Sequence, residues 1–140
     1  MSVRRVDQGS AAAAAGLLPG NIDPKLRKEL RTRYRQLRAM LHGAGLAATY
    51  AFVAAKTTGS LAESYGRVAD GLCLRLTDRG LLTGDPATMR PAEVLSQLGN
   101  MDTVRYARAS AEAAALLGWL SRLADASYQR AEPADDPASR

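Results

Sequence analysis

The segment TVRYARASAEAAALLGWLSRLADASY, residues 103–128, carries the clearest structural pattern in the sequence. Its apolar residues recur every three or four positions, as they do along one face of a helix. That face is formed by Tyr106, Ala109, Ala113, Leu116, Leu117, Leu120 and Ala124. Asp102 or Thr103 can cap the start of the helix. We therefore predict one long helix whose apolar face is buried against other helices.

The composition extends this prediction to the whole chain. The 140 residues include 27 Ala and 19 Leu but only 6 Val and 1 Ile. Ala and Leu lead the scale of helix propensity, whereas strands favour β-branched and aromatic residues. A chain of this length fits one domain. We expect an all-α, single-domain bundle of five to six helices over residues 1–130.

Stop and cap signals divide the remaining chain into helices. We predict helices over residues 3–18, 46–57, 60–77 and 91–98. A further helix is predicted to begin at residue 24 and to end between residues 43 and 45. Asn21 or Asp23 can cap the helix that begins at residue 24, while Ser60 and Glu63 form a capping box for the helix over residues 60–77. Residues 80–90 are expected to be a surface connection that turns at residues 84–86.

Both ends of the chain need separate interpretations. Arg4 and Arg5 precede an Ala-rich run, but residues 7–10 interrupt the pattern of a signal peptide, so a first helix is the simpler interpretation. Residues 131–140 are acidic and proline-containing without an apolar anchor, and we expect a disordered tail. No stretch approaches the roughly 18 apolar residues of a membrane-spanning helix, and we expect a cytoplasmic protein.

The positive charge is concentrated in one segment. Residues 25–38 hold seven cations and one acid, a charge of +6, so the rest of the chain carries −1. On a helix, Lys28, Arg31, Arg35, Arg38 and His42 line up roughly opposite an apolar stripe. This row fits a polyanion-binding surface. A solvated helix face is the alternative interpretation.

The residue types that carry chemistry are scarce. One cysteine, Cys73, and one histidine, His42, exclude an intramolecular disulfide and a Cys/His zinc site. Cys73 lies between two leucines and is interpreted as a core residue. His42 has no nucleophile at a recognisable spacing. We predict a non-enzyme with no catalytic residue, no metal, no cofactor and no small-molecule substrate.

Two segments resemble a known family. They are GLAATYAFVAAK, residues 45–56, and YARASAEA, residues 106–113, which continues into LLGWLSR, residues 116–122. In this order and about 50 residues apart, they resemble the small α-helical subunit of type III-B CRISPR–Cas RNA-targeting complexes. This is the fifth subunit of the Cmr effector, or RAMP-module small subunit. The predicted order of helices in this chain, from about Val3 to Tyr128, is also similar to that of the family.

The resemblance implies a role without catalysis in antiviral defence. Several copies of such a subunit stack beside the guide-bearing subunits and line the channel in which target RNA pairs with guide RNA. The implied partners are other subunits of the complex, copies of the same chain, and the backbones of both RNAs. RNA cleavage and cyclic-nucleotide synthesis belong to other subunits.

Charge and resemblance together predict the RNA-binding residues. We expect them to be Lys28, Arg31, Arg35, Arg38, Lys56, Arg105, Arg108 and Arg122. Lys56 also suits the C-terminal dipole of its helix. Trp119 and Arg122 can form a cation–aromatic platform, although such a tryptophan is more often partly buried in a core. Glu112 is expected to pair with Arg108 one turn away.

A second class of function fits the same residues. A helical scaffold or regulator without nucleic-acid contact would direct the basic row toward acidic protein partners. RNA binding by the assembled complex, or its absence, separates the two hypotheses. Copies that stack require two different contact patches, which we expect at the two ends of the bundle, near residues 19–24 and 80–99.

Overall fold

Helices account for most of the backbone. The computed structural model describes residues 3–131, and the side chains of residues 8–128 within them. That described part contains six helices and no strand, which confirms the all-α prediction. The helices are α1 Val3–Leu17, α2 Pro24–Ala44, α3 Leu46–Ala55, α4 Ala62–Asp78, α5 Pro91–Gly99 and α6 Thr103–Ala131. Beyond Ala131, the predicted tail lies outside the described residues.

Two aspartates begin the long helices, as predicted. The Leu26 backbone N–H donates to the Asp23 carboxylate at 2.8 Å, and that of Arg105 donates to Asp102 at 2.7 Å. Each carboxylate satisfies an N–H group that the first helical turn leaves unpaired. The chain leaves α2 through Gly45, whose φ of 95° favours glycine. α3 therefore follows α2 with only one residue between them.

The predicted capping box at the start of α4 is wrong. Leu61 is the N-cap residue and makes no side-chain cap hydrogen bond. Gly59 has a φ of 94°, and its carbonyl accepts from the Ala62 N–H at 3.2 Å. The chain is thus still in a turn at Ser60. The first helical residue comes after the position where a Ser60–Glu63 pair could cap it.

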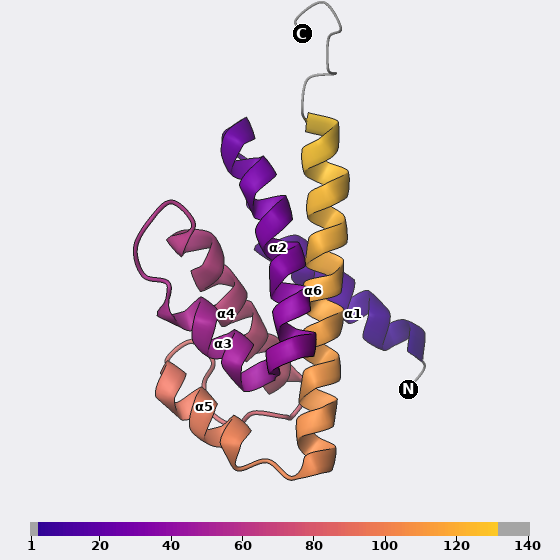
Figure 1. The fold of residues 1–140 in the computed structure, drawn as a ribbon. Helices are drawn as coiled ribbons and strands as arrows, with labels where there is room; N and C mark the ends of the chain where they lie inside the picture. Colours follow the sequence, from indigo (N-terminus) through magenta and orange to yellow (C-terminus); the bar gives the residue numbers. More distant parts are fainter. Residues whose placement is uncertain (1–2, 132–140) are drawn as a thin grey trace, which may run out of the picture.

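The core forms around α6. Figure 1 shows α6 running antiparallel to α2, with α1 crossing behind and α5 at the lower end. The contacts of α6 with α1 and α2 are the most extensive between elements. The predicted face is buried almost throughout: Ala109, Ala113, Leu116, Leu117, Leu120 and Ala124 are each at most 1% exposed. The half-buried Tyr106 completes it by packing against this core.

The apolar helix α3 lies among the other elements. It contacts α2, α4, α5 and α6. Leu46, Thr49, Tyr50 and Val53 are buried. Thr49 is satisfied locally because its hydroxyl donates to the Gly45 carbonyl at 2.8 Å.

Residues 80–90 are only partly a surface connection. The predicted turn is present, since the Ala87 N–H donates to the Asp85 carboxylate at 2.9 Å. Leu81 and Leu82, however, are each 2% exposed. Their N–H groups donate to the Leu76 carbonyl near the end of α4. These two leucines extend the core, which the sequence analysis did not predict.

Glu112 bridges α6 and the end of α4. Its carboxylate lies 2.9 Å from Arg79 Nε and 3.4 Å from Arg75 Nε. The predicted pairing with Arg108 is therefore wrong. Glu112 is 11% exposed, because its side of α6 faces α4, and there two arginines compensate the buried charge.

No helix within residues 3–131 has the length and apolar character to cross a membrane.

Truncation of the α6 face tests the core. Leu120→Ala should lower the free energy of unfolding by about 2–5 kcal/mol, because it leaves a cavity at a fully buried position. The measurement is urea denaturation followed by circular dichroism. Leu74→Ala is the matched control, since Leu74 is 51% exposed and should change stability by about 0.5 kcal/mol or less. Equal losses in both variants would contradict this placement of the core.

Removal of the Glu112 charge tests the link between α6 and α4. Glu112→Gln should lower the free energy of unfolding by about 1–3 kcal/mol, because it removes the charge of a largely buried carboxylate that lies against two arginines. Glu63→Gln removes an 84% exposed partner of Arg67 and should cost less than about 0.5 kcal/mol. Urea midpoints of both variants provide the measurement. A small loss for Glu112→Gln would show that the pair contributes little.

Candidate nucleic-acid interface

The predicted basic row lies along one side of α2, next to α6. Lys28 and Arg35 are exposed, whereas Arg31 and Arg38 are half-buried. The sequence pattern placed the whole row opposite the apolar stripe. In the structure, α6 lies along one side of this row, where Asp125 contacts Arg31 and Arg35. The row is thus the edge of a two-helix surface rather than a face of one isolated helix.

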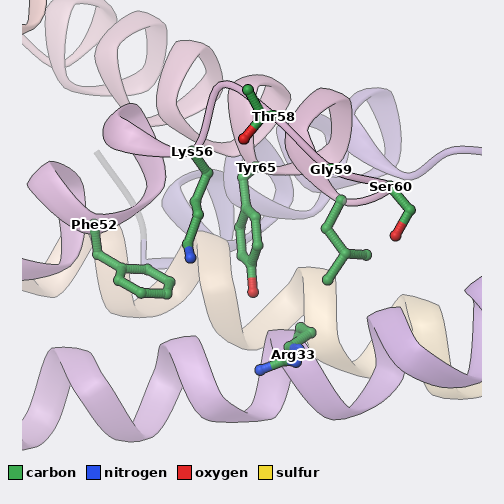
Figure 2. A pocket seen from close by; sticks show the side chains of 8 residues that line it. Arg33, Phe52, Lys56, Thr58, Gly59, Ser60 and Tyr65 are labelled. Atoms are coloured by element: carbon green, nitrogen blue, oxygen red, sulfur yellow. The ribbon is translucent and has the colours of Figure 1, made fainter.

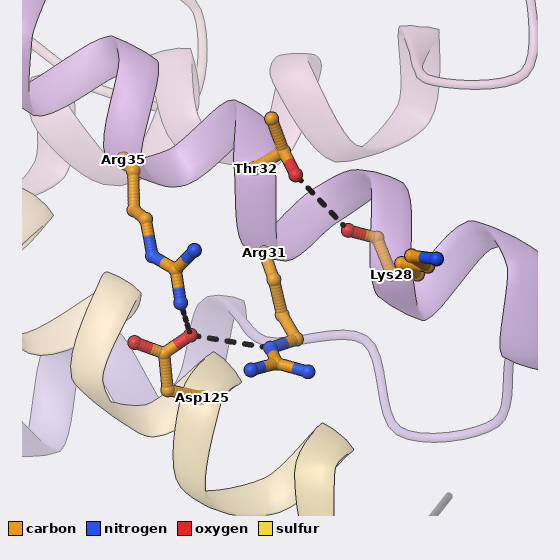
Figure 3. A network of polar contacts seen from close by, with 5 residues as sticks. All are labelled: Lys28, Arg31, Thr32, Arg35 and Asp125. Carbon is orange, nitrogen blue, oxygen red and sulfur yellow. Dashed lines mark hydrogen bonds and ion pairs between the residues drawn. The ribbon is translucent and has the colours of Figure 1, made fainter.

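Asp125 of α6 holds two arginines of this row (Figure 3). Its Oδ1 atom lies 3.2 Å from Arg31 Nε and 2.8 Å from Arg35 Nη2. The Arg31 side chain is 19% exposed and that of Arg35 is 55% exposed. Asp125 was not predicted as a site residue, because it lies 94 positions from Arg31 and 90 positions from Arg35 in the sequence. No local spacing signals such a contact.

Arg122 adds a cation from α6 to the same surface. It lies one helical turn from Gly118 and from Asp125. A Cβ atom added to Gly118 would stand 4.0 Å from Arg38 Nε, so this part of α6 faces Arg38. We call the surface of Lys28, Arg31, Arg35, Arg38, Arg122 and Asp125 the α2–α6 border. Its formal charge is +4.

Trp119 and Arg122 form the predicted cation–aromatic pair. The Arg122 guanidinium carbon lies 5.5 Å from the centroid of the Trp119 ring. Trp119 is half-buried and packs against the core, in agreement with its interpretation as a partly buried core residue. The tryptophan therefore supports the position of Arg122 at the border.

Lys56 lies on a different part of the molecule. It is the C-cap residue of α3, and its ammonium group lies 5.0 Å from the centroid of the Phe52 ring. Arg33, which was counted in the basic segment but not predicted as a site residue, shares a pocket with Lys56 (Figure 2). Lys56 therefore does not extend the α2–α6 border.

Arg105 and Arg108 differ in their surroundings. Arg105 Nη2 donates to the carbonyls of Gly80 and Leu81, at 2.7 and 3.1 Å. It thus ties the connection after α4 to the start of α6. Arg108 is exposed. RNA contact by these two residues stays a prediction, and the structure does not bring them into the α2–α6 border.

The residues with potential chemistry are dispersed. His42 is exposed in the last turn of α2. Cys73 is 4% exposed, and burial raises the pKa of its thiol, which disfavours the reactive thiolate. Burial also raises the pKa of Tyr50 and Tyr128 to about 12. Within the described residues, no three His, Cys, Asp or Glu side chains gather to hold a metal ion.

Fold and surface together define an all-α protein with a basic border between two antiparallel helices. A family model described as CRISPR-associated protein (Cas_Cmr5) matches residues 7–127. The chain belongs to this family, which confirms the resemblance found in the sequence. Membership implies a place in a CRISPR complex with other Cas subunits. Searches of curated proteins and of solved structures gave no match.

The Asp125 ion pairs can be measured by a double-mutant cycle. Asp125→Asn should lower the free energy of unfolding by about 1 kcal/mol, because the pairs are partly exposed. Combined with Arg35→Gln, it should give a coupling energy of about 0.5 kcal/mol that shrinks in 1 M salt, since ions screen exposed pairs. A coupling energy of zero at low salt would show that Asp125 does not hold Arg35.

Proposed function

We propose that this chain is the non-catalytic small subunit of a type III-B CRISPR RNA-guided, RNA-targeting complex in the cytoplasm. In this proposal, several copies stack and line the channel that holds target RNA paired with guide RNA. Family membership supports a role within a CRISPR complex. The α2–α6 border supports the assignment of RNA contact.

The observation that carries the proposal is the charge and form of this border. Five cations from two helices accompany a single acid, Asp125. Arg and Lys contacts with phosphates supply affinity without reading base sequence. A subunit that follows any guide–target duplex needs this property. The border provides this sequence-independent affinity for phosphates, and its cations lie on two packed helices rather than on a loop.

Asp125 has a positioning role in this proposal. A guanidinium has five N–H donors, so the bond from Arg35 Nη2 to Asp125 occupies only part of its capacity. The shared carboxylate fixes two long side chains whose ordering would otherwise cost conformational entropy on binding. It also reduces the local charge by one. The border thus gains order at some cost in electrostatic attraction.

Stacking of copies is part of the proposal. A head-to-tail filament uses two different patches of each subunit. Figure 1 places the beginning of α2 and the helix α5 at opposite ends of the bundle. These two ends carry residues 19–24 and residues 80–99, the segments expected to make contacts between copies.

Neutralisation of the border tests RNA contact. Arg35→Gln with Arg122→Gln should weaken retention of target RNA by the assembled complex. It should also reduce the slope of log affinity against log salt by roughly 0.7 for each phosphate that the border no longer neutralises. The measurement is a filter-binding titration over a salt series. The matched control is Arg67→Gln with Arg90→Gln, which removes two exposed cations from outside the border.

Unchanged affinity and slope in the Arg35/Arg122 variant would reject the border as an RNA surface. If that variant instead failed to retain another protein subunit while the control retained it, the scaffold function would replace the proposal.

A further inference from the structure

A second basic site lies on the other flank of α2. A pocket of about 220 Å³ opens between α2, the end of α3 and the turn before α4. We call it the Arg33–Lys56 pocket. It is lined by Arg33, Phe52, Lys56, Thr58, Gly59, Ser60, Leu61 and Tyr65. None of these residues belongs to the α2–α6 border.

The two cations of this pocket come from different elements. Figure 2 shows Lys56 and Tyr65 extending toward α2, with Arg33 below them on that helix. Arg33 donates to Gln36 Oε1 at 3.1 Å and lies 3.9 Å from a Glu29 oxygen. Glu29 does not line the pocket, and none of the lining residues is acidic. The lining therefore carries two positive charges, of which that of Arg33 is partly offset by Glu29.

Hydroxyl groups and a fixed wall complete the arrangement. Thr58 and Ser60 contribute hydroxyls from the turn before α4. Tyr65 is 4% exposed, and its ring packs edge-on against Phe52 with centroids 5.7 Å apart. Lys56 lies over that same Phe52 ring, which restrains its side chain. Burial raises the pKa of Tyr65, the positive charge of Arg33 opposes the rise, and the negative charge of Glu29 adds to it, so the phenol has both charges as electrostatic neighbours.

The chemistry of the lining selects an anion, and the volume selects a small one. Small-molecule sites usually measure about 300–1,000 Å³, so this pocket is too small for a whole cofactor. Arg and Lys with hydroxyl donors are the groups that bind phosphate oxygens. We propose that the Arg33–Lys56 pocket is a phosphate-binding subsite that takes one backbone phosphate of a single RNA strand. The RNA as the source of the phosphate rests on the proposed function, whereas the phosphate site does not.

A titration of the isotopically labelled full chain tests the subsite. The probes are a short oligouridylate, inorganic phosphate and polyglutamate, and the readout is the NMR shift of the amides of residues 58–61. We expect the oligouridylate to shift these amides in a saturable way. Arg33→Gln with Lys56→Gln should weaken the dissociation constant read from them by about tenfold. Arg67→Gln with Arg90→Gln is the control and should leave it unchanged.

Each other outcome has a defined meaning. Saturation by inorganic phosphate without a response to oligouridylate supports the phosphate site but overturns RNA as its source. An equal response to polyglutamate, or equal affinity in the Arg33/Lys56 variant, overturns the subsite. Oligouridylate shifts confined to Arg35 and Arg122 leave the proposed function intact and reject this pocket. Shifts confined to the pocket reject the α2–α6 border as the RNA surface.

Discussion

Burial of one face of α6 determines how the neighbouring helices are arranged. Its inner positions combine small and large residues, with Ala109, Ala113 and Ala124 on either side of three leucines. Small side chains let neighbouring helices approach, and the leucines fill the space between them at the density of a well-packed interior. Since α1 and α2 both pack on this helix, α6 sets where the basic helix lies.

The same helix also organises the charges. Each of two acids on α6 binds two arginines from another part of the bundle: Glu112 holds a pair at the end of α4, and Asp125 holds a pair on α2. The Glu112 pair is largely buried and ties helices together, whereas the Asp125 pair reaches the surface. An arginine-rich chain thus uses part of its positive charge internally. What remains outside includes Arg31 and Arg35, which Asp125 holds in place.

Much of the fold could be predicted because its signals are local. The helix period, Asp23 and Asp102 as caps, and the glycine at the end of α2 each act within a few residues. The errors occurred where the local pattern was incomplete or a distant element intervened. Ser60 does not cap α4 because the turn at Gly59 delays the helix, and Leu81 and Leu82 are buried because the core continues past the end of α4.

The candidate site likewise has features that local sequence patterns predict and features that depend on packing. Composition, helical period and short motifs are enough to predict that the protein is helical, that its positive charge lies on α2, and which family it resembles. Three relations become visible only in the folded chain: Asp125 orders Arg31 and Arg35, Arg105 binds the connection after α4, and Arg33 and Lys56 share a pocket. These relations depend on which helix faces meet, and packing between residues far apart in the chain sets that.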